Sequence, residues 1–303
     1  MREASVGNRQ SGGDASPRSR TVRVGATDGF SIAATEYEPP GAARAVVVIN
    51  AATGVRRRYY ERFALHLASH GFAVVTYDYR GIGDSAPGRL RGFRACLHEW
   101  GELDQPAVLA HAREWQPDRP LTIIGHSVGG QIIGLLRDPE RVSRVLMVAA
   151  QHNYWGFWPL SRRYVLWGLW HVFMPGAAYA LGYFPSSKVG LGEDLPRGIA
   201  LDWARWCRSP GALVEAIGGD AAQRFARYSG PILALSFDDD RSLAPRRAVE
   251  ELLRFYAGAQ VEHRHLTAAS LGVPRVGHFG YFRESVRERG WPIAAEWLGA
   301  VPT

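Results

Sequence analysis

The chain has 303 residues, of which 46% are apolar, enough to build one large domain or a core domain that carries an insertion. Its net charge of +7 comes almost wholly from scattered arginines, which argues against the concentrated basic face of a nucleic-acid-binding protein. The two cysteines, Cys96 and Cys207, are too few for a disulfide framework. No charged segment leading into an apolar one opens the chain, so we expect a cytoplasmic protein.

The first part of the sequence predicts a tail followed by a hairpin. Residues 1–19 are rich in Ser, Gly and Arg without periodicity, which is typical of a disordered tail. Residues 21–26 and 31–37 then predict two short strands, joined by a turn at Asp28-Gly29.

Buried strands and helices alternate through the next part of the chain. Continuous apolar runs predict strands buried on both faces, and helical spacing lies between them. The strands fall at 45–49, 72–77, 121–124, 145–150, 231–236 and 261–266, and the helices at 59–70, about 93–115, about 245–257 and the C-terminus. This alternation predicts an α/β fold, with a mainly parallel central sheet flanked by helices, formed by residues 20–150 and 229–303.

Between residues 151 and 228 the alternation stops, which predicts a helical cap inserted into the core domain. Six of the ten tryptophans fall in this segment, and they either wall a substrate pocket or form the small core of the cap itself. Residues 164–184 contain no Asp, Glu, Lys or Arg and approach the length of a membrane span. The breaker Met174-Pro175-Gly176 at the midpoint favours a helical hairpin of the cap over an element in or on a membrane, which stays the alternative.

The most informative motif is Gly125-His126-Ser127-Val128-Gly129, directly after a predicted strand. This G-x-S-x-G pattern predicts a nucleophile elbow, because glycines beside the serine allow a strand and a helix to approach closely around a strained turn. The serine hydroxyl would then be exposed at the carboxyl edge of the sheet. The backbone N–H of Val128 would point into the same space and stabilise an oxyanion.

A nucleophilic serine needs a histidine base and an acid that orients it, in the chain order Ser, Asp, His. The acid is expected in Asp238-Asp239-Asp240 after the strand at 231–236; Asp240 is our choice and Asp239 the reserve. His278, between glycines in the loop after the last strand, is the expected base.

Further site residues follow from position. The small residues after the strand at 45–49 suggest the Ala52 N–H as the second oxyanion donor. His152 follows a strand end and is either a pocket residue or a buried structural one; Trp155 and Trp158 are best placed to overhang Ser127 from the cap. No metal-binding or nucleotide-binding motif competes, so we expect no cofactor and no metal.

With these motifs assembled, the chain resembles the α/β-hydrolase superfamily from about Thr21 onward. The resemblance rests on Tyr-Asp-Tyr-Arg-Gly-Ile-Gly-Asp-Ser at 77–85, Gly-His-Ser-Val-Gly-Gly at 125–130, the Asp240 turn and Gly-His-Phe at 277–279. The chain looks most like the serine aminopeptidase and monoglyceride-lipase-like branch, with Asn-Ala-Ala-Thr-Gly at 50–54 in place of the His-Gly oxyanion motif. The resemblance implies that Ser127 is the nucleophile, His278 the base and Asp240 the orienting acid.

The sequence therefore predicts a serine esterase or thioesterase, which cleaves a small-molecule substrate with a hydrophobic acyl group through an acyl-enzyme. One alternative is an acyltransferase that delivers the acyl group to an alcohol, amine or thiol. The other is a catalytically silent protein that uses the same pocket to bind a ligand. Neither the natural substrate nor the oligomeric state follows from the sequence.

Overall fold

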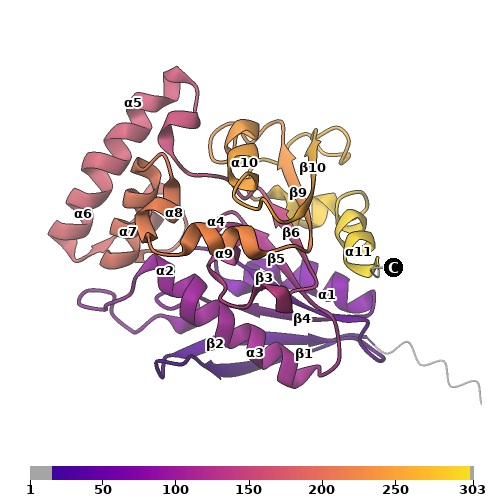
Figure 1. Ribbon diagram of the computed structural model, residues 1–303. Helices are drawn as coiled ribbons and strands as arrows, with labels where there is room; N and C mark the ends of the chain where they lie inside the picture. Colours follow the sequence, from indigo (N-terminus) through magenta and orange to yellow (C-terminus); the bar gives the residue numbers. More distant parts are fainter. Residues whose placement is uncertain (1–15, 301–303) are drawn as a thin grey trace, which may run out of the picture.

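An eight-stranded sheet forms the centre of the protein in the computed structural model, which describes residues 16–300 except for the side chains of 212 and 213 (Figure 1). The strand order is β1-β2-β4-β3-β5-β6-β9-β10. Strands β4 to β10 of that order run parallel, whereas β1 and β2 are antiparallel to their neighbours. The strands are β1 (Arg18–Gly25), β2 (Ser31–Glu38), β3 (Ala45–Asn50), β4 (Phe72–Tyr77), β5 (Leu121–His126), β6 (Arg144–Val148), β9 (Pro231–Phe237) and β10 (Gln260–Leu266).

The predicted α/β fold with a mainly parallel sheet is confirmed. Every residue of β3, β4, β5 and β6 is buried, because helices cover both faces of these central strands. The helices of the core are α1 (Glu61–Ser69), α2 (Leu97–Glu99), α3 (Gln105–Trp115), α4 (Val128–Gln131), α10 (Arg246–Leu253) and α11 (Trp291–Gly299). A π-helical turn over Trp100–Asp104 joins α2 to α3, so the predicted helix at 93–115 begins at Leu97.

Strand β1 begins inside the segment that the sequence assigns to the tail. Residues 1–15 lie outside the described part of the chain, but Arg18 and Ser19 already pair with Glu38 and Tyr37 of β2. The side chain of Arg18 meets the Glu38 carboxylate at 3.2 Å. The first residues of this edge strand are exposed and are held by cross-strand charge pairs, so apolar and polar residues do not alternate there. The composition therefore predicted a tail that extends too far.

Residues 151–228 leave the sheet after β6 and return at β9, its parallel neighbour. This excursion contains five helices and a two-stranded ribbon. They are α5 (Leu160–Gly168), α6 (Met174–Leu181), β7 (Tyr183–Phe184), β8 (Leu195–Pro196), α7 (Arg197–Arg208), α8 (Ala212–Ile217) and α9 (Ala221–Arg227). Figure 1 shows α5 to α8 to one side of the core, whereas α9 lies against the core. The insertion predicted as a cap thus has helical structure, and we keep the name cap for it.

The hairpin predicted at Met174-Pro175-Gly176 is wrong. Helix α5 continues through a π-helical turn, Leu169–Phe173, directly into α6, and the chain reverses only at Gly182, whose φ is +78°. Pro175 lies in the first turn of α6, after the wider π-helical turn, where a helix tolerates a missing N–H. Within residues 16–300 no helix is long and apolar enough to cross a membrane.

Candidate active site

Ser127 lies at a strained turn between β5 and α4. Its φ of 54° and ψ of −119° are conformations that non-glycine residues rarely adopt, and such strain is typical of functional sites. A Cβ on Gly125 would lie 2.5 Å from the Cα of Gly130, and a Cβ on Gly129 would lie 2.3 Å from the carbonyl oxygen of Asn50. The glycines of the motif are therefore required by backbone packing around Ser127.

His278 and Asp240 form a buried pair beside the elbow. The Nδ1 of His278 lies 2.6 Å from the Oδ2 of Asp240, and both side chains are almost fully buried. An ionised carboxylate only accepts, so Nδ1 carries the proton and the lone pair of the ring remains on Nε2. The other oxygen of Asp240 accepts the Leu243 N–H at 3.2 Å, which fixes the carboxylate in its turn.

The neighbouring aspartates have different contacts. Asp239 accepts the backbone N–H groups of Val276 and Gly277, both at 2.8 Å, and so holds the loop that carries His278. Asp238 accepts the Ala268 N–H at 3.3 Å. The structure brings Asp240, and not the reserve Asp239, to the imidazole.

His126, to which the motif assigned no role in the site, links both sides of the elbow. Its Nδ1 lies 2.8 Å from the hydroxyl of Tyr60, and its Nε2 lies 2.9 Å from the backbone carbonyl of His278. Complete burial holds the pKa of His126 well below its usual value, so the ring is neutral. Only the fold shows this role, because Tyr60 and His278 are far from His126 in sequence.

The two expected oxyanion donors differ in availability. Val128 is the first residue of α4, where backbone N–H groups have no partner within the helix. The N–H of Ala52, in contrast, donates to the hydroxyl of Tyr60 at 2.9 Å. Ala52 would have to release Tyr60 before it could bind an oxyanion.

The three cap-side residues predicted to contact substrate lie where the chain enters the cap. His152 is buried against Phe157, with ring centroids 4.8 Å apart, and burial lowers its pKa to about 4. Trp158 is buried too, and its indole N–H donates to the carbonyl of Ser242 at 2.8 Å, two residues beyond Asp240. Trp155 is half-buried. These contacts give His152 and Trp158 packing roles, and leave Trp155 as the more accessible aromatic of the three.

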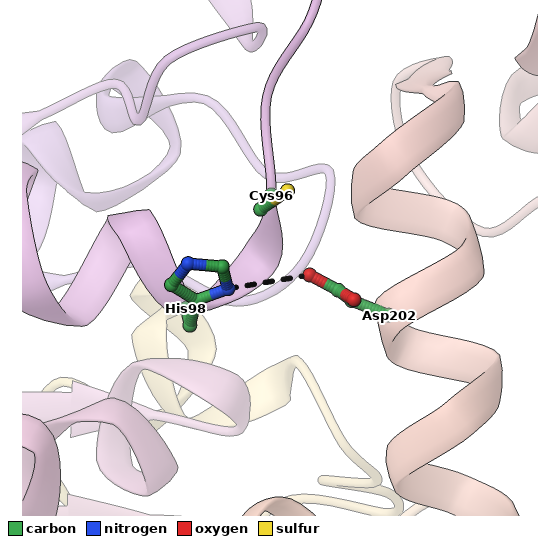
Figure 2. A group of neighbouring side chains, drawn as sticks. All are labelled: Cys96, His98 and Asp202. Atoms are coloured by element: carbon green, nitrogen blue, oxygen red, sulfur yellow. Dashed lines mark ion pairs between the residues drawn. The ribbon is translucent and has the colours of Figure 1, made fainter. Parts of the chain in front are cut away.

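A Cys/His/Asp cluster that no sequence motif predicts lies where the cap meets the core. Donor atoms of Cys96, His98 and Asp202 lie within 4.8 Å of one another, and Figure 2 shows Asp202 reaching from α7 toward α2. The carboxylate of Asp202 accepts the Leu97 N–H at 3.0 Å and lies 3.5 Å from Nδ1 of His98, while the Glu99 carboxylate accepts the Cys96 N–H at 2.7 Å. Three such donors could hold a metal ion, but these hydrogen bonds already account for their arrangement. They join α2 of the core to α7 of the cap, and we call this contact the tie between core and cap.

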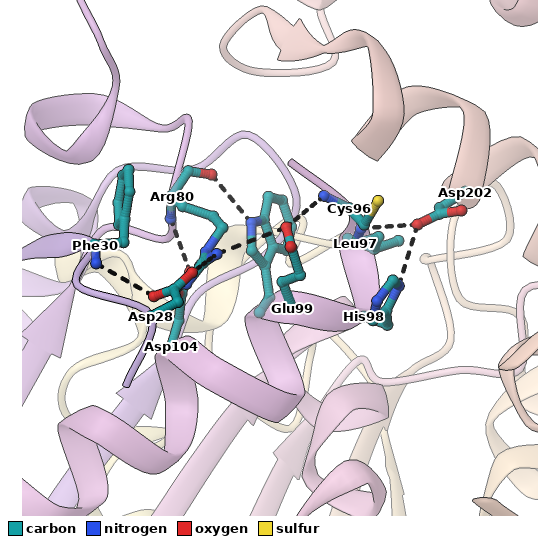
Figure 3. A network of polar contacts seen from close by, with 10 residues as sticks. Asp28, Phe30, Arg80, Cys96, Leu97, His98, Glu99, Asp104 and Asp202 are labelled. Atoms are coloured by element: carbon teal, nitrogen blue, oxygen red, sulfur yellow. Dashed lines mark hydrogen bonds and ion pairs between the residues drawn. The ribbon is translucent and has the colours of Figure 1, made fainter. Parts of the chain in front are cut away.

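The tie continues into the core through Arg80, as Figure 3 shows. The Arg80 guanidinium is buried and pairs with Asp28 and Asp104, both at 2.7 Å, and lies 3.7 Å from Glu99. Burial raises the pKa of Asp104 to about 6, although the contact with Arg80 opposes this. The conspicuous Tyr-Asp-Tyr-Arg motif therefore contributes an arginine that anchors structure.

A model of the alpha/beta hydrolase family matches residues 46–288, which is most of the chain. With the sheet order and the elbow described above, the chain belongs to the alpha/beta hydrolase family.

Solved structures share this fold over almost the whole chain. A carboxyl esterase from Bacillus coagulans has 15% identity and a TM-score of 0.62, with 93% of this chain and 98% of that chain covered. An esterase from Exiguobacterium antarcticum has 17% identity and a TM-score of 0.60, with 93% and 100% covered. A soluble variant of monoglyceride lipase from Saccharomyces cerevisiae, in complex with a substrate analogue, has 16% identity and a TM-score of 0.65, with 93% and 94% covered. No curated protein sequence matches the chain.

Proposed function

We propose that this protein is a serine hydrolase that cleaves an ester or thioester of an apolar acyl group through an acyl-enzyme on Ser127. The observation that carries the proposal is the strained turn at Ser127, whose neighbour His126 is hydrogen-bonded to the backbone of His278, together with the buried His278–Asp240 pair. The similar proteins named as esterases and as a monoglyceride lipase support ester hydrolysis as the reaction class.

The reaction would proceed in two halves. The Oγ of Ser127 attacks the acyl carbon while its proton passes to Nε2 of His278, and the Val128 N–H stabilises the oxyanion. The carbon–oxygen or carbon–sulfur bond then breaks, and the imidazolium returns the proton to the leaving alcohol or thiol. In the second half, water attacks the acyl-serine while its proton passes to Nε2 of His278. The imidazolium then returns this proton to the Oγ of Ser127, and the acid is released.

Asp240 would keep the imidazole in the productive tautomer throughout. Its hydrogen bond to Nδ1 leaves Nε2 as the basic nitrogen and stabilises the imidazolium that forms. The cap would set acyl preference, with the half-buried Trp155 as the proposed substrate contact.

A fluorophosphonate probe and a panel of esters and thioesters of increasing acyl length test the proposal. Wild-type protein should label once and release acid, while Ser127→Ala and His278→Ala should lose turnover and the double variant should be hardly worse than either. Ser270→Ala, an exposed loop serine, is the matched control. Transfer of the acyl group to an added alcohol or amine in preference to water would indicate an acyltransferase, and failure to label would indicate a silent binding protein.

A further inference from the structure

Exposed apolar side chains are concentrated on one part of the cap. Of the ten large hydrophobic side chains that are exposed within the described part of the chain, nine lie between residues 160 and 189. They are Leu160, Tyr164, Val165, Trp167, Val172, Phe173, Tyr179, Leu181 and Val189. The tenth, Val261, lies on β10. Single scattered residues of this kind are normal on protein surfaces, but a cluster marks an interaction surface.

Eight of the nine lie on the continuous rod formed by α5, the π-helical turn Leu169–Phe173 and α6, and within this rod α5 has no buried residue. We call the exposed side of this rod the outer face of α5 and α6. The π-helical turn and α6 have a buried inner side: Trp170, Met174 and Ala178 pack into the cap, where Trp170 meets Trp203 of α7 with centroids 5.1 Å apart. Figure 1 shows α5 and α6 along the outer edge of the cap, away from the sheet. Tyr164 is 78% exposed and Val165 70%, so the rod is apolar on a side that no other part of the described chain covers.

The segment that carries this outer face contains cationic residues and no acidic ones. No Asp or Glu occurs from residue 141 to residue 192. Exposed Arg162 lies in the first turn of α5, exposed Lys188 follows α6, and the side chain of Arg91 packs beside Gly182 at the end of α6. The first acidic residues after this segment are Glu193 and Asp194. Glu193 pairs with Arg56, and Asp194 accepts a hydrogen bond from the Ser187 hydroxyl.

We propose that the outer face of α5 and α6 docks on the surface of an anionic lipid bilayer. Apolar side chains would enter the boundary between headgroups and acyl chains, and the flanking cations would contact lipid phosphates. Tyr and Trp suit this boundary because they combine an apolar ring with a polar edge. The segment of a second copy that faced this one would bring only cations, since it contributes no carboxylate, and this favours lipid over self-association.

Vesicle flotation tests the docking without reference to catalysis. Wild-type protein and the Ser127→Ala variant should bind equally to vesicles of phosphatidylcholine with about a third phosphatidylglycerol, and more weakly to phosphatidylcholine alone or at high salt. Val165→Ser with Val172→Ser should weaken binding at least about tenfold by removing apolar contact. Arg162→Gln with Lys188→Gln should remove the preference for the anionic vesicles.

Val261→Ser is the matched control, because it removes an exposed valine from another surface and should leave vesicle binding unchanged. If the double valine variant fails to fold, Tyr179→Ser tests the same face alone. Equal binding by the valine variants and Val261→Ser, or no binding by wild type, would overturn the proposal. So would a wild-type dimer in sedimentation velocity that the valine substitutions dissociate, which would make the face a contact between copies. If wild-type protein binds the vesicles but hydrolyses no ester or thioester, the result counts against the proposed function and not against the docking proposal.

Discussion

The Nε2 of His126 donates a hydrogen bond to the backbone carbonyl of His278 at 2.9 Å, so the residue before Ser127 holds the loop that carries the expected base. On the other side of the ring, the Tyr60 hydroxyl accepts the Ala52 N–H and donates to Nδ1 of His126. The imidazole of His126 therefore connects the loop of Ala52, through Tyr60, with the elbow and with the loop of His278.

Replacement of His126 by Phe should remove the hydrogen bonds to Tyr60 and to the His278 carbonyl, while an aromatic ring still fills the core. The buried Tyr60 hydroxyl and His278 carbonyl would each lose a partner, at a cost of about 1–3 kcal/mol each. A displaced His278 should lower kcat by roughly 10². Urea unfolding and steady-state kinetics measure the two effects, with the largely exposed His70→Phe as control. A His126→Phe enzyme with wild-type kcat would show that the link is not needed.

Substitution of Asp240 should lower kcat, whereas substitution of Asp239 should mainly lower stability. Asp240→Asn should reduce kcat by on the order of 10⁴, because the amide can favour the wrong tautomer of His278. Asp239→Asn should leave most of kcat but destabilise the fold by about 1–3 kcal/mol, since one amide oxygen replaces two acceptors for the N–H groups of Val276 and Gly277. Kinetics and thermal unfolding of both variants separate these roles. The reverse pattern would move the orienting role to Asp239.

The tie between His98 and Asp202 should make stability depend on pH. The hydrogen bond that His98 donates to Asp202 raises the pKa of His98 above its usual 6.5, with smaller contributions from Glu102 and Glu99. Arg205 lies 3.6 Å from the other oxygen of Asp202. A raised pKa stabilises the folded state below pH 6.5, and this stabilisation is lost as the pH rises through the folded-state value.

Because His98 is about a third exposed, the contribution should be under about 1 kcal/mol. The difference in unfolding free energy between wild type and His98→Gln should be larger at pH 5.5 than at pH 8.5. Equal differences at both pH values would mean that the pair contributes nothing.

Trp155 and Trp158 should respond differently to replacement by Ala. Trp158 is buried and bonded to Ser242, so its loss should destabilise the protein by about 3–5 kcal/mol. Trp155 is half-buried, and its loss should instead shift the preferred acyl length and raise KM. Unfolding curves and an acyl-length series check both. An unchanged acyl profile in Trp155→Ala would assign this tryptophan to the packing of the cap.

The sequence predicted the sheet well because buried parallel strands leave continuous apolar runs, as at Val46 to Ile49. It predicted the elbow because a serine between glycines, directly after such a run, is typical of a tight strand-to-helix turn. It failed where the outcome depends on distant partners. The break expected at Pro175 was overridden by a π-helical turn, and the contacts of His126 with Tyr60 and of Asp202 with Leu97 join residues far apart in the chain. Polar links of this kind have no periodicity, so only the fold reveals them.

Gly129 of the elbow should tolerate substitution far less than Gly168 of the cap. A Cβ on Gly129 would meet the carbonyl oxygens of Asn50 and Ala51 at 2.3 and 2.7 Å, and backbone atoms of β3 cannot move without disturbing the sheet. Gly129→Ala should therefore destabilise the fold by about 3 kcal/mol, at the upper end of ordinary overpacking, and slow labelling of Ser127. Gly168→Ala is the matched control: Gly168 lies in α5 with a helical φ of −60° and nothing within 4 Å of a new Cβ. Alanine there should stabilise the protein by about 0.5–1 kcal/mol, because it restricts the unfolded chain and favours helix. Urea unfolding and fluorophosphonate labelling rates measure both, and a Gly129→Ala protein as stable and reactive as wild type would show that the elbow can relax away from β3.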